Sequence, residues 1–274
     1  MGGAAAGVAP GLPSERETGR GRRGRTGSVT LRALRLLEGF SAEEPELTLT
    51  ELAHRSGLPV TTVYRLATAL LSWGALERLP DGRFRIGLRL WEVASLAPRG
   101  LGLRRLALPV LQDLSHVTRE NVQLGVRDGD EVVFLERIAG RAAVPVLTRV
   151  GGRFPLTATG LGLALLAYAP LEVAEQVASA SLRRFTPYTL TDPTLIAEEL
   201  AATRRRGFAV SDRQISEETL SVAAPIFGPT EVVVAAVSLV VRADGATPWA
   251  LGQLVQTSAR AIGRSLAAAA WREG

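Results

Sequence analysis

The segment Leu47–Trp73, LTLTELAHRSGLPVTTVYRLATALLSW, constrains the fold of this chain more than any other. Thr48 followed by Glu51 is the pattern of a capping box, in which each residue satisfies a free backbone N–H of the other, so a helix is predicted to start here. Gly57 and Pro59 interrupt this helix, because glycine tolerates positive φ and the residue before proline is pushed out of the helical region. A second helix is predicted after the break.

The second predicted helix has one apolar and one polar side. Its apolar residues recur at intervals of three and four: Val63, Leu66, Ala67, Leu70 and Leu71. Its polar side carries Thr61, Thr62, Tyr64, Arg65 and Thr68. Two helices joined by a tight turn, the second with a polar outer face, are typical of a helix-turn-helix. The pattern predicts that the helix starting at Val60 enters the major groove of DNA, with Arg65 the best candidate for a contact to guanine.

The residues after this helix predict a β-hairpin. Two short alternating runs flank Asp81-Gly82, a strong turn signal. A hairpin directly after a recognition helix is the wing of a winged helix. Arg83 and Arg85 alternate with Phe84 and Ile86, so we expect the apolar pair to pack below and the two Arg to contact phosphates.

The sequence divides into four predicted parts. Residues 1–27, with a GRGRRGR run and few large apolar residues, predict a disordered basic tail. A winged helix-turn-helix is predicted over 28–87, a linker helix over 88–100, and a second domain over 101–272. The first domain is expected to open with a scaffold helix whose inward-facing residues are Val29, Leu31, Leu34, Leu36 and Leu37.

Charge is distributed unevenly along the chain. The formal net charge is +5, and all 32 basic residues are Arg. Residues 60–105 hold eight Arg and three carboxylates, 8 − 3 = +5, whereas residues 106–274 hold 16 Arg and 17 carboxylates, 16 − 17 = −1. Positive charge therefore gathers on the second helix and the segment after it, where a DNA duplex would lie.

Several classes of protein are excluded or disfavoured by composition. The chain has no cysteine, which excludes disulfides and cysteine-based zinc sites and fits a cytoplasmic location. Its longest apolar runs, 160–169 and 232–241, are shorter than the roughly 18 residues that a membrane span needs. No secretory signal pattern stands at the N-terminus. We therefore expect no membrane partner.

The second half alternates predicted strands and helices. Strands are predicted at 121–126, 131–138, 144–150, 221–227 and 232–241. Helices are predicted at 157–168, 192–206 and 249–271. Strands joined by hairpins and interrupted by helices favour an α+β domain with an antiparallel sheet.

The sequence offers no catalytic constellation. Its only two histidines, His54 and His116, have no partner at metal-ligand spacing, and no GxSxG, HExxH or GxxxxGK[ST] motif occurs. A binding domain is favoured over an enzyme, with no catalytic residue, metal or cofactor expected. Two alternatives remain: a small-molecule enzyme with an incidental helical domain, and a winged-helix regulator whose C-terminal half only oligomerises.

From about Ser28 to Trp271 the chain resembles the IclR family of transcriptional regulators. SGLPVTTVYRL resembles the family's recognition-helix motif, and NVQLGVRDGDEVVFLERIAG and RVGGRFPLTATGLGLALLA resemble the start of its effector-binding domain. TPYTLTD, RRRGFAVSD and SVAAPIF resemble later blocks, in the correct order. The resemblance implies a GAF-like α/β effector-binding domain after the winged helix, a dimer or dimer of dimers, and a pseudo-palindromic operator on double-stranded DNA. It also implies a small organic effector, either a carboxylate or an aromatic metabolite.

The resemblance also implies an effector pocket and shows where this chain departs from the family. The implied pocket residues are Leu147, Gly160, Leu161, Asp212, Ser221 and Ser238. Gly162-Leu163 stands where the family has Gly-Lys, Ser216-Glu217-Glu218 where it has Glu-x-Gly, and Val240 where it has a second serine. These departures predict a less polar pocket and an effector more apolar than a two- or three-carbon acid. The alternative is a pocket that no longer responds to an effector.

Overall fold

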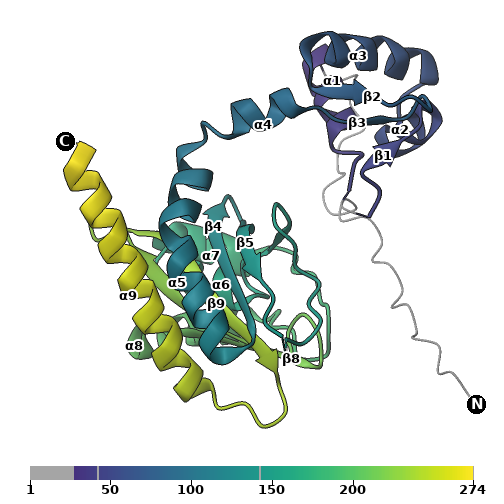
Figure 1. Ribbon diagram of the computed structural model, residues 1–274. Helices are drawn as coiled ribbons and strands as arrows, with labels where there is room; N and C mark the ends of the chain where they lie inside the picture. Colours follow the sequence, from purple (N-terminus) through teal and green to yellow (C-terminus); the bar gives the residue numbers. More distant parts are fainter. Residues whose placement is uncertain (1–27, 42, 142, 274) are drawn as a thin grey trace, which may run out of the picture. The chain divides into compact units, whose positions relative to one another are not determined.

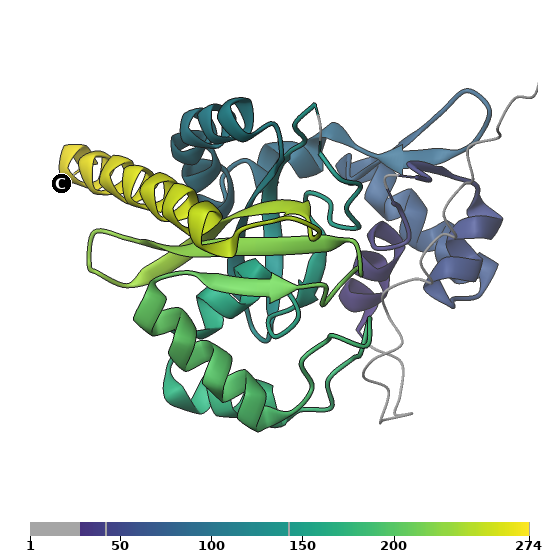
Figure 2. The ribbon, with the colours of Figure 1, turned by 90° about the horizontal axis from the view of Figure 1, so that it is seen from below.

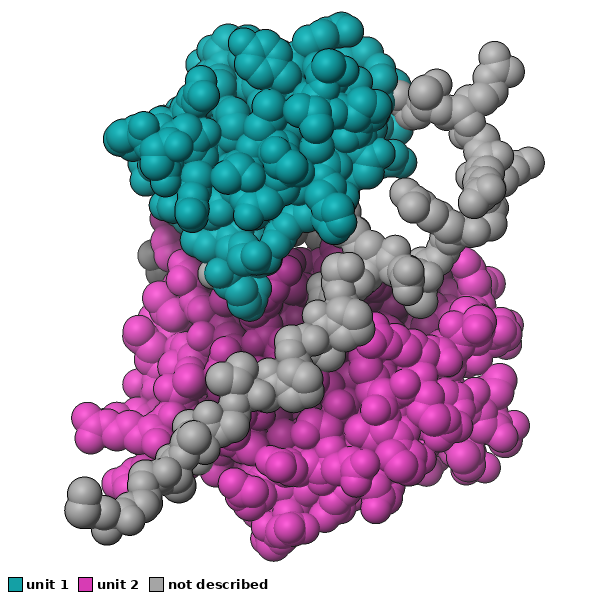
Figure 3. Space-filling view, turned by 90° about the vertical axis from the view of Figure 1, so that its right-hand side faces the viewer, with its two compact units in different colours: residues 1–94 teal, residues 95–274 magenta. Residues whose placement is uncertain are grey.

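The computed structural model describes residues 28–41, 43–141 and 143–273 (Figure 1). They form two compact units, divided between Ala94 and Ser95 (Figure 3). The helix predicted over 88–100 is shorter than expected, because α4 ends at Ala94 and Pro98–Gly102 forms a separate π-helical turn. The predicted basic tail, residues 1–27, lies outside the described residues.

The first unit is a winged helix. Its helices are α1 (Val29–Leu37), α2 (Leu49–Ser56), α3 (Val60–Trp73) and α4 (Leu88–Ala94). Its strands are β1 (Glu46–Leu47), β2 (Leu76–Arg78) and β3 (Phe84–Ile86). The strands form an antiparallel sheet in the order β1-β3-β2, so the predicted wing hairpin is confirmed.

Local chemistry fixes the ends of α2 and α3 as the sequence predicts. The Thr48 N–H donates to Glu51 Oε2 at 2.7 Å, and the Glu51 N–H donates to Thr48 Oγ1 at 3.3 Å, so the capping box is confirmed. Gly57 ends α2 with φ of 67° and Gly74 ends α3 with φ of 88°, both in the left-handed region that favours glycine.

The capping box predicts a measurable loss of stability. Thr48→Ala is expected to lower the free energy of unfolding by about 1 kcal/mol, because the Glu51 N–H loses its acceptor. Urea unfolding of the full chain at pH 7 measures this loss. Thr50→Ala is the matched control: Thr50 is exposed in the same helical turn but does not cap it, so no comparable loss is expected. An equal loss in both variants would contradict the role of the cap.

The same capping box predicts a dependence on pH. Hydrogen bonds from the backbone and side chain of Thr48 hold the pKa of Glu51 below its ordinary value of 4.5. A carboxyl whose folded pKa is lowered stabilises the fold fully above its unfolded pKa. This stabilisation is therefore expected to be complete above about pH 4.5 and to disappear as pH falls through the lowered folded value.

Two expectations about the core of this unit are wrong. Leu36 is fully buried, but Val29, Leu31 and Leu34 are 57%, 54% and 48% exposed. At 100° per residue, Leu31 and Leu34 lie on the opposite side of α1 from Leu36, and Val29 stands in the first turn. On the wing, Phe84 is buried as expected, whereas Ile86 is 41% exposed at the end of β3.

The second unit is an α+β domain built on one six-stranded sheet. Its helices are α5 (Leu103–Thr118), α6 (Gly160–Leu166), α7 (Leu171–Ser179), α8 (Pro193–Arg206) and α9 (Pro248–Glu273). Its strands are β4 (Asn121–Asp128), β5 (Glu131–Ile138), β6 (Arg153–Pro155), β7 (Ala209–Asp212), β8 (Thr219–Phe227) and β9 (Val233–Arg242). The order is β6-β5-β4-β9-β8-β7 and every neighbouring pair is antiparallel, so the predicted sheet type is confirmed.

Helices cover both faces of this sheet. The helices α5 and α9 pack side by side on one face, and α6, α7 and α8 lie on the other (Figures 1 and 2). Alternation along β9 shows the two environments. Val237 and Leu239 belong to the core under α5 and α9, whereas Ala236 belongs to the core under α6. Each central strand therefore presents one set of side chains to each core. No helix among the described residues has the length and apolarity to cross a membrane.

The prediction of a strand at 144–150 is wrong, because this segment has no regular secondary structure. Side chains of β4 hold it in place. Asn121 Nδ2 donates to the Val144 carbonyl at 2.7 Å, and Gln123 Nε2 donates to Thr148 Oγ1 at 2.5 Å. Pro145 has no N–H to offer a ladder. The segment therefore covers one face of the sheet instead of extending it.

Candidate functional site

The outer face of α3 is polar, and the described residues of its unit leave it exposed. Val63, Leu66 and Ala67 are buried, whereas Tyr64 is 60% exposed and Arg65 is also exposed. The Arg65 side chain makes no hydrogen bond or ion pair with any other described residue. Its guanidinium therefore has its full set of donors available to an external partner.

The rest of the predicted DNA-contacting set divides by exposure. Val60, Thr61 and Thr68 are exposed, and Thr62 is half-buried. The Thr68 hydroxyl donates to the Tyr64 carbonyl at 2.8 Å, which leaves its oxygen able to accept a hydrogen bond. The first turns of α3 thus carry most of the exposed polar groups.

Both predicted wing arginines are exposed and already have carboxylate neighbours. Arg85 Nη2 lies 2.7 Å from Glu77 Oε2, directly across the hairpin, and this side-chain hydrogen bond is the main reason why the pKa of Glu77 is lowered. Arg83 Nε lies 3.4 Å from Asp81. Arg78, which sequence reasoning did not single out, is a third exposed cation and lies over the Phe84 ring at 5.8 Å. The wing therefore offers three guanidinium groups, two of them partly neutralised.

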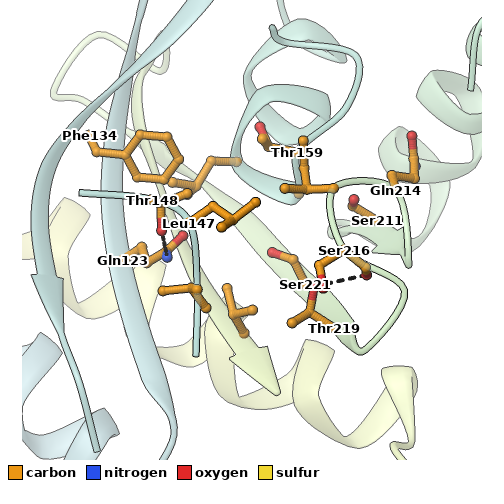
Figure 4. Close-up of a pocket in the computed structure, with 15 residues that line it drawn as sticks. Gln123, Phe134, Leu147, Thr148, Thr159, Ser211, Gln214, Ser216, Thr219 and Ser221 are labelled. Carbon is orange, nitrogen blue, oxygen red and sulfur yellow. Dashed lines mark hydrogen bonds between the residues drawn. The ribbon is translucent and has the colours of Figure 1, made fainter. Parts of the chain in front are cut away.

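The second unit contains a cavity of about 40 Å³ on the sheet face that α6 covers (Figure 4). Its lining comes from strands, from the start of α6, from the 144–150 segment and from the loop after β7. The lining residues are Gln123, Phe134, Val146, Leu147, Thr148, Thr159, Gly160, Leu161, Ser211, Gln214, Ile215, Ser216, Thr219, Ser221 and Val240.

This pocket is uncharged, and most of its exposed surface is apolar, as the departures from the family predict. Six lining residues carry hydroxyls and two carry amides, while no lining residue is acidic or basic. Phe134, Leu161 and Val240 supply apolar surface. In Figure 4 the Gln123 amide points toward Thr148, and Ser216, Thr219 and Ser221 gather on the opposite side. Such a lining suits a small organic molecule with an apolar body and a few hydrogen-bonding groups.

Four of the six implied effector residues line the pocket: Leu147, Gly160, Leu161 and Ser221. Asp212 does not line the pocket, because successive side chains of β7 point to opposite faces of the sheet. Ser211 faces the pocket opposite Ser221, whereas the Asp212 side chain is half exposed and pairs with Arg213 at 3.1 Å. Ser238 is fully buried on the pocket face of β9 but is not part of the lining.

Gly160 allows α6 to begin directly against β8. A Cβ at Gly160 would lie 2.6 Å from Ser221 Oγ and 3.2 Å from both Cβ and the carbonyl oxygen of Ser221. Thr159 caps the helix, and its Oγ1 accepts a hydrogen bond from the Gly162 N–H at 2.9 Å. A side chain at Gly160 would therefore press on the pocket side of the sheet.

The loop after β7 forms a wall of the pocket through Gln214, Ile215 and Ser216, of which the sequence associated only Ser216 with the pocket. Thr186 Oγ1 donates to the Arg213 carbonyl at 2.6 Å, and Thr189 Oγ1 donates to the Gln214 carbonyl at 2.7 Å. The Leu190 N–H donates to Gln214 Oε1 at 3.2 Å. Arg213 itself has φ of 54°. Hydroxyls from a distant segment thus hold this wall, and no short sequence motif signals such contacts.

A winged helix with a free recognition face, joined to a domain with a hydroxyl-lined pocket, defines the class of ligand-responsive DNA-binding regulators. No cluster of three or more potential metal ligands occurs in the described part of the chain. Comparison with known families gives the same class. Residues 29–80 match the IclR helix-turn-helix domain, and residues 97–264 match the C-terminal domain of bacterial IclR transcriptional regulators. This chain belongs to the IclR family, which confirms the resemblance.

Individual relatives agree with this assignment. The transcriptional regulator KipR of Bacillus subtilis is 33% identical over 77% of this chain and 84% of its own length. The repressor IclR of Escherichia coli is 30% identical over 79% of this chain and 80% of its own length. A crystal structure of an IclR homolog from Microbacterium hydrocarbonoxydans, complexed with 4-hydroxybenzoate, is 36% identical with a TM-score of 0.83, covering 88% of this chain and 100% of that one. The chain is an IclR-type transcriptional regulator with a helix-turn-helix and an effector-binding domain.

Proposed function

We propose that this regulator binds a pseudo-palindromic operator as a homodimer or a dimer of dimers. The single observation that carries DNA recognition is the exposed Arg65 on the outer face of α3, whose side chain has no partner among the described residues. Thr61, Thr62 and Tyr64 would approach neighbouring bases and phosphates. The exposed apolar side chains of Val29, Leu31 and Leu34 offer a surface for a second copy. Two recognition helices would read half-sites about one helical turn, or a multiple, apart.

The proposed effector is a small aromatic or similarly apolar carboxylic acid. The uncharged lining supports this choice. Val240 and Phe134 give the pocket apolar surface, which an aromatic ring can contact and which a two-carbon acid has no apolar body to contact. The homolog from Microbacterium hydrocarbonoxydans in complex with 4-hydroxybenzoate supports it as well. Effector binding would change DNA affinity by linkage between the two sites.

A gel shift on the DNA upstream of the protein's own gene tests both parts. We expect a shifted complex without ligand and a change in its midpoint when 4-hydroxybenzoate or a related aromatic acid is added. Binding that no ligand alters would favour a C-terminal domain that only oligomerises. Calorimetry gives a second test: tight binding of glyoxylate or pyruvate would contradict an apolar effector.

The wing is expected to position the protein without reading sequence. Arg83→Ala and Arg85→Ala should each reduce the steepness with which salt weakens DNA binding, by up to about 0.9 in the log–log slope, with base preference unchanged. Arg83 should have the larger effect, because the Arg85 guanidinium is held closer to its carboxylate. Binding isotherms at several salt concentrations measure the slope. Arg205→Ala, on α8 of the other unit, is the control and should leave it unchanged; altered base preference in a wing variant would contradict this role.

A further inference from the structure

A β-bulge in β5 changes the face on which its side chains stand. Before the bulge, Phe134 pairs with Gly125; after it, Glu136 pairs with Leu124. Two residues of β5 thus correspond to one step on β4, and Leu135 is the extra residue. Strict alternation would have put Glu136 on the same face as Phe134, which lines the pocket.

The bulge therefore moves Glu136 off the pocket face and puts Arg137 on that face. Glu136 instead lies on the α5 side of the sheet, where its Oε2 is 2.6 Å from Arg104 Nη2. The next residue, Arg137, pairs with Gln123 and shares its face. Gln123 lines the pocket. A cation thus stands one strand away from a lining residue of an otherwise uncharged site.

Arg137 belongs to a row of polar residues that crosses three neighbouring strands. Gln123 pairs with Arg137 on β5 and with Ser238 on β9. Arg137 Nε and Ser238 Oγ are both buried, and neither has a hydrogen-bond partner among the described residues. A buried polar atom without a partner is costly, so such atoms call for an explanation. Two of them flank one pocket residue here.

A third buried polar atom without a partner among the described residues lies nearby on β4. Asn121 lies on the pocket face two residues before Gln123, and its Oδ1 is buried and unpartnered among the described residues, while its Nδ2 holds Val144. The 144–150 segment covers both residues, and Thr148 accepts the hydrogen bond of Gln123. Release of this hydrogen bond would free the Gln123 amide to donate to a ligand.

We propose that Arg137, Gln123 and Ser238 form a subsite that receives the carboxylate of the effector. This inference rests on the proposed function, because it assigns the charged end of the proposed ligand. The Arg137 Nε–H, the Ser238 hydroxyl and the Gln123 amide are donors, which is what a carboxylate requires. The apolar body of the acid would then lie against Phe134 and Val240, which line the pocket.

Calorimetry of the full chain with matched acids and amides tests the subsite. The probes are 4-hydroxybenzoate with 4-hydroxybenzamide, and benzoate with benzamide. The wild-type protein is expected to prefer each acid. Arg137→Gln should weaken binding of the acids by about tenfold to a hundredfold and change binding of the amides little. Arg205→Gln removes the same charge from an exposed position on α8 and should change neither.

Two further variants keep the test decisive if Arg137→Gln does not fold. Arg137→Lys keeps the charge and should retain part of the preference for acids, and Ser238→Ala should reduce that preference. Thermal unfolding and ligand-free operator binding report whether each variant folds. Equal affinity of the wild-type protein for acids and amides, or an equal loss for both in the Arg137 variants, would overturn the subsite. Binding of amides alone would overturn the subsite and leave the effector pocket standing, whereas binding of no probe would overturn both.

Discussion

Arg65→Ala is expected to weaken operator binding by about 1–3 kcal/mol and to relax base preference at one position of each half-site. The physical reason is that Arg65 is exposed on the outer face of α3 and has no partner in its own chain among the described residues. A guanidinium can donate two parallel hydrogen bonds to guanine, which no other base accepts in the same way. Fluorescence anisotropy with the operator and with single-base variants measures both effects.

The control for this variant distinguishes a direct contact to a base from a general loss of positive charge. Arg35→Ala removes one exposed guanidinium from α1 of the same unit, outside the recognition helix. We expect it to leave base preference unchanged. If Arg65→Ala weakens binding equally on every sequence, then Arg65 contacts a phosphate, and direct readout must come from another residue of α3.

Gly160→Ala is expected to reduce effector affinity by at least about tenfold while leaving ligand-free DNA binding intact. The new Cβ would lie 2.6 Å from Ser221 Oγ, which can rotate away, but also 3.2 Å from the Ser221 carbonyl oxygen, which belongs to β8. Relief of this contact requires α6 and β8 to separate by a few tenths of an ångström, and small shifts of this kind are costly in a close-packed site. Calorimetry with 4-hydroxybenzoate and a gel shift without ligand measure the two quantities.

Gly102→Ala provides the matched control. A Cβ at Gly102 meets no atom within 4 Å, so the same substitution is expected to leave ligand binding unchanged. Thermal unfolding of both variants shows whether a lost affinity reflects a local or a global change. If Gly160→Ala binds the acid as tightly as the wild-type protein, the start of α6 does not shape the ligand site.

The sequence predicts the winged helix well, because its boundaries depend on local chemistry. The Thr48–Glu51 box, the turn at Gly57 and the end of α3 at Gly74 are set by neighbouring residues alone, and the structure confirms each. The hairpin between β2 and β3 follows from turn residues in the same way. What local chemistry does not determine is which apolar face meets a core, and so Leu31 and Leu34 are exposed against expectation.

The pocket is less predictable, because its residues come from segments distant in sequence. The 144–150 segment has the composition of a strand, yet hydrogen bonds from Asn121 and Gln123 hold it as a cover. The side chain of Ser211 rather than that of Asp212 enters the pocket, as the pairing of β7 with β8 requires. The bulge at Leu135 has no turn residue to announce it. The register of the strands and the position of the covering segment depend on contacts between distant segments, which sequence periodicity does not encode.

The pocket has a floor made of strands and walls made of irregular segments. The floor strands also support the core under α5 and α9 through their alternate residues, so any shift of a strand disturbs packing on both faces of the sheet. The walls, by contrast, are attached through a few side-chain hydrogen bonds, such as those from Thr186 and Gln123. A domain of this design can acquire a new ligand through changes in two short loops, at little expense to the framework that holds them.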